Sequence, residues 1–281
     1  MKNCQPPDIL YHYTTREGLL GIIQKREIWA ANIRYLNDSS EFTAAVEVAK
    51  TVLDTFPYDE RKLNKESVIK GFYSWLDSLK YQAESYVCSF SEDGDLLSQW
   101  RSYTKAGNGY AIGFDTAALR QLAKEQSFFL EQCRYDEPAQ KELIKSCFQA
   151  GIECLCATSE VEGNPTASAE NIFAEKCLLP FLCSAPLVKN RAFAEEREWR
   201  LVAPFHGSKQ SELFFRSGKS MLVPYHPFSL GEKGKELPIA KVIIGPSPHG
   251  PLDSQAVLKL LTSNGAKANS CGWSSIPFRD W

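Results

Sequence analysis

The sequence predicts an α+β protein, with a central mixed or antiparallel sheet that helices flank. Segments with strand character gather toward the two ends of the 281-residue chain, whereas residues 137–187 have the pattern of helices. Because strands and helices do not alternate regularly, a doubly wound parallel sheet is not expected. The length is near the upper limit for one hydrophobic core. We therefore expect a single domain over residues 1–281, with a helical insertion at about 137–187.

The first expected strand covers residues 9–13, and a helix follows it at once. Thr14 and Glu17 fit a capping box, in which a hydroxyl and a carboxylate bond the free N–H groups of the first helical turn. Beyond them, apolar residues recur at helical spacing. These apolar residues are Leu19, Leu20, Ile22 and Ile23.

Further strands and helices follow from the same patterns of spacing. Asp115 directly precedes a helical pattern and has a side chain suited to an N-cap. A second cap-like pair, Asp38 and Glu41, follows a turn at 35–38, and a polar break separates two central helices at 159–168. The other expected helices cover 42–53, 60–80, 99–103, 116–124, two parts of 137–187, and 253–261. The other expected strands cover 28–30, 86–90, 110–114, 198–203, 221–224, 241–245 and, as an edge strand, 274–278.

Composition narrows the classes of function. The net charge of −2 creates no strong field that would favour nucleic acid or an acidic membrane, although a local basic groove remains compatible with it. The nine cysteines include no C-x-x-C pair and form no ligand-spaced cluster with the four histidines, so no metal is expected. The first residues contain no apolar signal core, and no stretch approaches the roughly 20 apolar residues that span a bilayer. We expect a cytoplasmic protein that does not bind membranes.

His12 is the first candidate site residue. In a strand, His12 and Thr14 face one way, whereas Tyr11 and Tyr13 face the other. Two hydrogen-bonding side chains at a strand-to-helix turn suit the hydroxyl groups of a ligand. The alternative is a core histidine bonded to backbone, with Thr14 acting only as a helix cap.

The run of residues 195–200 is the second candidate. In a strand, Glu198, Arg200 and Val202 share one face, which is charged at two positions before it becomes apolar. Such charges can mark an exposed strand end, or they can deliver an acid into a cleft. The local pattern leaves both interpretations open.

Aromatic residues between 89 and 110 are the third candidate. Trp100, Tyr103 and Tyr110 lie among polar, glycine-containing turns and could stack on a planar ring of a ligand. The alternative is that Trp100 and Tyr103 anchor a loop to the core. No Gly-Lys-Ser/Thr follows Gly107-x-Gly109, so these glycines do not form a phosphate loop. Serine-hydrolase and zinc-protease motifs are also missing from the sequence.

Taken together, these motifs resemble the DUF2971 family of bacterial proteins of unknown function. The resemblance extends over nearly the whole chain and is weakest at about 137–187. The similar segments are residues 10–15 and 18–20, Asn32, and residues 35–42, 88–91, 97–103, 109–114, 196–200, 243–246 and 276–279.

A second resemblance suggests an activity. The strand ending in His-x-Thr, with a helix directly after it and a glutamate on a late strand, is similar to ADP-ribosyltransferases. By this resemblance His12 holds the ribose or nicotinamide end of NAD, and Glu198 binds the ribose 2′-hydroxyl and positions the acceptor. Tyr35 or Tyr110 would stack on nicotinamide, and Arg34 or Arg200 would bind the pyrophosphate. The remaining expected NAD-binding residues are Tyr13, Thr14, Asn37 and Trp100.

Glu195 and Glu196 are close competitors for the catalytic role. Glu198 is preferred because it lies inside the strand, beside Trp199 and Arg200. A carboxylate near the oxocarbenium-like state of a breaking glycosidic bond stabilises that cation, and no metal is needed.

Three functions are therefore open. The first is an ADP-ribosyltransferase or NAD glycohydrolase, acting as a toxin or antiphage effector on nucleic acid or protein, with a neutralising or activating protein as a further partner. The second is a non-catalytic module that senses a nucleotide or a nucleic acid. The third is a metal-dependent nuclease or hydrolase, in which two acidic groups bind Mg²⁺. These groups are Asp38 with Glu41, and Glu92 with Asp93 and Asp95.

Overall fold

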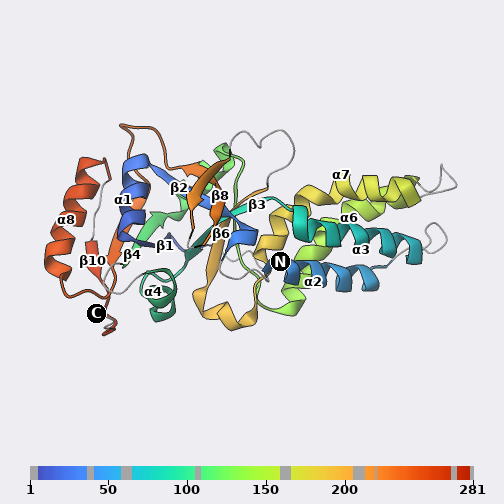
Figure 1. Cartoon of the computed structure of the whole chain (residues 1–281), viewed down its shortest axis with the longest axis horizontal. Helices are drawn as coiled ribbons and strands as arrows, with labels where there is room; N and C mark the ends of the chain where they lie inside the picture. Colours follow the sequence, from blue (N-terminus) through green and yellow to red (C-terminus); the bar gives the residue numbers. More distant parts are fainter. Residues whose placement is uncertain are drawn as a thin grey trace.

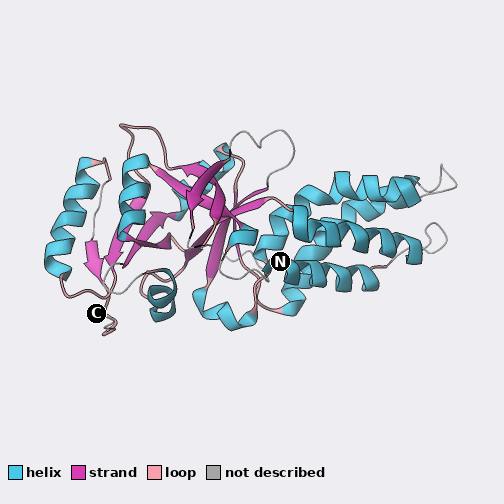
Figure 2. Ribbon diagram, viewed as in Figure 1, coloured by secondary structure: helices cyan, strands magenta, loops and turns pink. Residues whose placement is uncertain are grey.

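A mixed β-sheet lies at the centre of the molecule, with helices on both sides (Figures 1 and 2). The α+β class and the helix-flanked sheet that the sequence predicts are confirmed. The computed structural model describes residues 6–36, 41–57, 65–104, 109–158, 166–204, 213–218, 220–266 and 271–278. No helix in these ranges is long and apolar enough to cross a membrane.

The sheet has ten strands in the order β10-β9-β4-β1-β3-β2-β8-β7, and β6 joins β3 to β5 outside this path. β10 runs parallel to β9, and the other pairs are antiparallel. The strands are β1 (Ile9–Thr15), β2 (Glu27–Asn32), β3 (Ser85–Ser91), β4 (Gly109–Asp115), β5 (Phe129–Gln132), β6 (Glu198–Pro204), β7 (Phe214–Ser217), β8 (Leu222–Ser229), β9 (Ile239–Ile244) and β10 (Cys271–Trp273).

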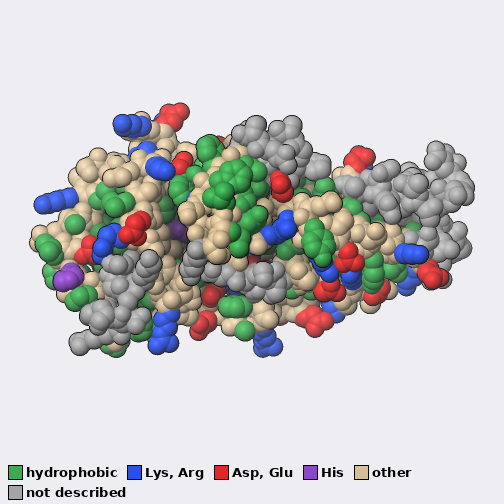
Figure 3. Space-filling model, in the orientation of Figure 1, with side chains coloured by type: hydrophobic (Ala, Val, Ile, Leu, Met, Phe, Trp, Pro, Cys, Tyr) green, Lys and Arg blue, Asp and Glu red, His purple; other side chains and the backbone are tan. Residues whose placement is uncertain are grey.

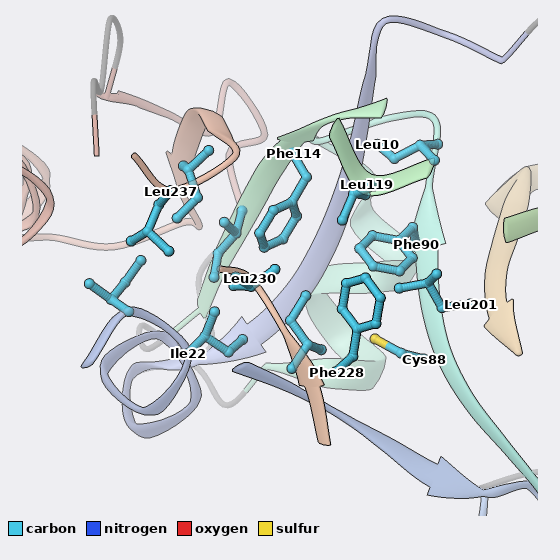
Figure 4. Close-up of a cluster of buried hydrophobic side chains, with 14 of the residues drawn as sticks. Leu10, Ile22, Cys88, Phe90, Phe114, Leu119, Leu201, Phe228, Leu230 and Leu237 are labelled. Atoms are coloured by element: carbon cyan, nitrogen blue, oxygen red, sulfur yellow. The ribbon is translucent and has the colours of Figure 1, made fainter. Parts of the chain in front are cut away.

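One face of the sheet packs against α1 (Arg16–Lys25), α5 (Thr116–Glu125) and α8 (Gly250–Ser263). Figure 4 shows part of this core, in which side chains from several strands meet those of α1 and α5. Burial of this face follows the two-residue alternation of the strands, since Phe90, Phe114 and Leu201 point into it.

The other face carries a four-helix layer, at the right of Figure 1. The two helices expected at 137–187 are α6 (Glu137–Thr158) and α7 (Thr166–Ser184). They pack against α2 (Glu41–Thr55) and α3 (Lys65–Gln82), around a second core that includes Val87 and Val202 of the sheet. The remaining described elements are α4 (Leu97–Tyr103) and three short 3₁₀ helices, η1 (Ile33–Tyr35), η2 (Ala185–Leu187) and η3 (Arg191–Glu196).

The sheet opens between β1 and β3. These strands share the single register pair Tyr11↔Ser91, whereas β1 pairs with β4 along all seven of its residues. Nearer the start of β3, the same edge of this strand pairs with β2 at Tyr86 and Val87. β6 follows the opposite edge of β3 from Ser85 to Ser91.

Several local expectations change in the structure. Thr15, not Thr14, caps α1, because its hydroxyl accepts from the backbone N–H of Gly18 at 3.2 Å. Asp115 caps α5 as predicted. Residues 274–278 are not a strand, since the hydroxyls of Ser274 and Ser275 and the Ser275 N–H bond to Asp95. β5 and β7 were not predicted; both are short and lack a clear alternation.

Arg26 ties the end of α1 to two distant segments. It has a left-handed backbone (φ 56°), and its guanidinium donates to the carbonyls of Gly231, Lys235 and Asn264 at 2.6–3.1 Å. Arg26→Ala should lower the free energy of unfolding by about 2–3 kcal/mol, because three backbone carbonyls lose the charged donor that the buried Arg26 supplies. Urea denaturation measures this loss. The exposed Lys124→Ala, in the last turn of α5, is the control; equal midpoints for both variants would contradict the assigned role.

Candidate functional site: a buried charge cluster beside the sheet

Five charged side chains meet between β6 and the four-helix layer. Glu198 and Arg200 lie on β6, Glu41 begins α2, Glu196 ends η3, and Lys189 lies between η2 and η3. At most 10% of each side chain is exposed. We call these five residues the charge cluster. Buried charges are costly unless they are paired, so their gathering in one place marks a candidate functional site.

Arg200 and Lys189 pair with all three carboxylates. The Arg200 guanidinium donates to Glu198 at 2.7 and 3.1 Å, to Glu41 at 3.0 Å and to the Pro186 carbonyl at 2.6 Å. Lys189 Nζ donates to Glu196 Oε2 at 2.6 Å and to Glu198 Oε2. Glu198 therefore accepts charged hydrogen bonds on both of its oxygens.

The two neighbouring glutamates are shifted in opposite directions. Burial by itself would raise the pKa of Glu198, but the charges of Arg200 and Lys189 outweigh it and lower the pKa to about 2. Burial raises the pKa of Glu196, and the contacts with Lys189 offset only part of this effect. Paired carboxyl groups whose environments separate their pKa values are suited to different roles in acid–base chemistry.

The local backbone places both glutamates in the cluster. Arg197, between η3 and β6, has a left-handed conformation (φ 42°), and its own side chain is exposed. Glu196 and Glu198 both reach Lys189 from the two sides of this turn. The Glu198 N–H donates to the Tyr135 hydroxyl at 2.7 Å, which holds the start of β6 against the segment before α6.

A cavity of about 540 Å³ adjoins the charge cluster at Glu41 and Lys189. This volume is in the usual range for small-molecule sites. Its other charged or polar side chains include those of Tyr135, Gln140 and Arg191. The full lining is Glu41, Ala44, Tyr135, Asp136, Glu137, Pro138, Gln140, Val188, Lys189, Asn190 and Arg191.

Tyr103, the last residue of α4, senses the charges of the same cluster. Burial, followed by the charges of Glu198 and Glu196, raises the pKa of Tyr103 to about 12. Tyr103 is also 39% exposed.

The sequence suggested that His12 and Glu198 belong to one site, but the structure places them on opposite faces of the sheet. Tyr11, Ser91 and Glu198 are in register across three strands, so their side chains share one face of the sheet. His12 is on the other face, with Cys88 Sγ 3.6 Å from its Nδ1 and the Phe90 ring 5.8 Å away. Its Nδ1–H donates to the Ser89 carbonyl at 2.9 Å, and burial lowers its pKa, which favours the neutral ring.

The expected aromatic residues are engaged by protein groups. Trp100 is 1% exposed, donates its indole N–H to Asp95 and packs edge-on against Tyr13. The Tyr13 hydroxyl donates to the Asp93 carbonyl and accepts from Leu96 N–H. Tyr110 is 2% exposed and donates to Asp253 of α8. For Trp100 the sequence left two roles open, stacking on a ligand or anchoring a loop to the core. Its contacts in the structure are those of an anchor.

The other expected NAD-binding residues are dispersed. Thr14 faces α1, where an added Cβ at Gly18 would lie 1.9 Å from its hydroxyl oxygen. Arg34 is exposed and donates to the Tyr81 carbonyl, and Tyr35 is 39% exposed. Asn37 lies outside the described residues. Arg200 is the expected pyrophosphate ligand that the structure places beside Glu198.

Two members of the cluster were missed by sequence reasoning. Glu41 was interpreted only as a helix cap or a metal ligand, and Lys189 lies in a connecting segment with no pattern around it. The alternation of Glu198 and Arg200 was the available signal, because two charges on one face of a buried strand require partners.

A metal site gains no support in the described part of the chain, where no group of three or more His, Cys, Asp or Glu side chains is placed to hold an ion. Asp38 lies outside the described residues. Glu92 accepts from Trp199 and Gln132, and Asp95 from Trp100 and two serines.

Comparison with known proteins gives one family and two solved structures. The structures are of Thermus sp. 2.9 DarT, in complex with ADP-ribosylated single-stranded DNA and in complex with NAD⁺. Each is 10% identical to this chain with a TM-score of 0.34, and the matches cover 99% and 96% of this chain and 98% and 97% of the DarT chains. No curated protein matches the chain. The family resemblance expected from the sequence is confirmed over residues 99–201, which match DUF2971, a protein family of unknown function.

Proposed function

We propose that this protein cleaves the nicotinamide–ribose bond of NAD and transfers ADP-ribose, with the charge cluster as its reaction centre. The observation that carries the proposal is the arrangement of two buried carboxyl groups around shared cations: Glu198 and Glu196 both accept from the ammonium group of Lys189, and Glu198 also accepts from Arg200. This arrangement agrees with the opposite directions of their pKa shifts. One of them stays ionised over a wide pH range, and the other gains affinity for a proton.

These two states match the needs of glycosidic bond cleavage. As the bond between ribose C1′ and the nicotinamide nitrogen breaks, its electron pair leaves with nicotinamide and positive charge develops on the ribose. The ionised Glu198 stabilises this charge. Glu196, with its raised pKa, accepts the proton of the hydroxyl or amine that attacks C1′. Water in place of that acceptor gives hydrolysis to ADP-ribose.

The adjoining cavity is the proposed site for NAD. Lys189 and Arg191 supply positive charge for the pyrophosphate, and Tyr135 and Gln140 supply a hydroxyl and an amide. Residues on the opposite face, His12, Thr14 and Tyr110 among them, do not belong to this site. A nucleic acid or a protein would be the acceptor, and a second protein that neutralises or activates the enzyme is compatible with a toxin or defence role in the cytoplasm.

A second candidate function is a non-catalytic module that binds a nucleotide. The observation in its favour is that both Glu198 oxygens already accept hydrogen bonds from Arg200 and Lys189. A carboxylate held in this way can maintain a binding surface without meeting a substrate.

Filling the cavity tests the binding site, and product analysis separates the two functions. Ala44 lines the cavity from an exposed position on α2, and Thr43 is exposed beside it but does not line the cavity. In calorimetric titrations with NAD, Ala44→Phe should weaken binding at least about tenfold, and Thr43→Phe should bind as the wild type does. Equal affinity of both variants would place NAD elsewhere.

The same mixtures are then analysed for nicotinamide, with cell extract added as a source of acceptors. Release of nicotinamide supports the transferase or glycohydrolase. Binding that is sensitive to Ala44→Phe, with NAD recovered intact, supports the binding module.

A further inference from the structure

The β7–β8 hairpin carries a concentration of exposed apolar side chains. Phe214, Phe215, Met221 and Leu222 are each more than half exposed. Hydrophobic side chains gather over this part of the molecule in the space-filling view (Figure 3). β7 ends the strand order of the sheet, and no described strand pairs with its outer edge. It contains neither proline nor lysine, the residues that commonly protect such edges.

Pro224 determines which backbone groups of β7 face outward. Phe215 lies opposite Pro224, which has no N–H, so this pair cannot exchange two backbone hydrogen bonds. The exchanging pairs are then Phe214↔Tyr225 and Arg216↔Val223. Because hydrogen-bonding direction alternates along an antiparallel strand, the N–H and C=O of Phe215 point toward the open edge.

The side chains of β7 complement a copy of the same strand. A two-fold axis through paired Phe215 residues brings Phe214 of each copy opposite Arg216 of the other, on the same face of the joined sheet. A guanidinium stacks favourably on an aromatic ring. Within one chain, three rings form a row that we call the Trp29–Tyr225–Phe214 ladder. The ring centroids of Phe214 and Tyr225 lie 5.8 Å apart, and those of Tyr225 and Trp29, which are stacked, lie 4.4 Å apart.

We propose that two copies of this chain associate through antiparallel pairing of their β7 strands, centred on Phe215. The sheets of the two copies then form one continuous sheet, and the Trp29–Tyr225–Phe214 ladder continues onto the Arg216 side chain of the second copy. On the other face of the hairpin, Phe215 packs against its counterpart at the two-fold axis, which removes apolar surface from water.

Sedimentation equilibrium of the full chain over a range of concentrations tests the dimer. Phe215→Lys should shift the protein to a monomer, since it places like charges opposite each other at the two-fold axis. The matched control is Phe129→Lys, which changes a 48% exposed phenylalanine on β5, and it should leave the dimer intact. A monomeric wild-type protein at all concentrations, or equal dimerisation of Phe215→Lys, would overturn the proposal.

Cross-linking tests the register independently. Under oxidising conditions Phe215→Cys should form a covalent dimer, because the paired Cα atoms of opposite strands lie about 5.5 Å apart. Ser217→Cys is the control, since residue 217 would face residue 213 of the other copy and not its own counterpart. The native cysteines are common to both variants. Covalent dimers that form equally with both would contradict the register.

Discussion

Glu198→Gln should lower the rate of nicotinamide release by about 10²–10⁴-fold, the range expected when a charge that stabilises a transition state is removed. The amide keeps the volume of the side chain and one carbonyl acceptor, so the loss comes mainly from the missing negative charge. Release of nicotinamide from NAD is followed by chromatography. A thermal melt of the same sample establishes that the variant is folded.

Glu195→Gln is the matched control for this substitution. Glu195 is exposed and lies three residues away in the chain. Its substitution makes the same change from carboxylate to amide outside the charge cluster. It should retain wild-type activity. If Glu198→Gln and Glu195→Gln release nicotinamide at the same rate, Glu198 has no catalytic role.

Arg200→Met should lower the free energy of unfolding by about 3–5 kcal/mol at neutral pH, because it leaves the buried carboxylates Glu198 and Glu41 without their shared cation. Arg197→Met is the control, since Arg197 is half exposed and pairs with Asp93 at the surface. An exposed pair contributes at most about 1 kcal/mol. Equal losses in the two variants, measured by urea denaturation, would contradict a stabilising role for the cluster.

The charge cluster also predicts how the stability of the folded protein changes at acidic pH. The pKa of Glu198 is lowered from 4.5 to about 2 in the folded chain. Its contribution to stability is therefore complete above the unfolded pKa and is lost as the pH falls from about 4.5 to about 2, with a magnitude near 3 kcal/mol. Arg200→Met should reduce this loss, because the carboxyl group no longer has the cation that keeps it ionised. A pH dependence that is the same in both proteins would argue against the assigned cause.

Sequence reasoning succeeded where short-range patterns decide the structure. The alternation at residues 198–202 correctly placed Glu198 and Arg200 on one face, and Asp115 was recognised as a helix cap. The two central helices also lie where their composition predicts them.

The features that could not be predicted from the sequence depend on strand register and on packing between segments that are distant in the chain. Whether His12 shares a face with Glu198 depends on the register of β1 against β3, and a shift of one residue would reverse it. Lys189 enters the cluster because η2 and η3 pack beside β6, not because of its neighbours in the chain. Trp100 is an anchor because Asp95 accepts its indole N–H, a contact that no spacing rule predicts.

In the proposed mechanism the reaction centre consists of Glu198, Glu196 and their two cations. Detection of the reaction products tests this assignment most directly. Wild-type protein and Glu198→Gln are incubated side by side with NAD and cell extract, and nicotinamide and ADP-ribose are followed by mass spectrometry. We expect the wild type to release nicotinamide, with an equal amount of ADP-ribose free or attached to an acceptor, and the variant to release almost none. NAD that remains intact with the wild type, or is cleaved equally by both, would contradict the proposed function.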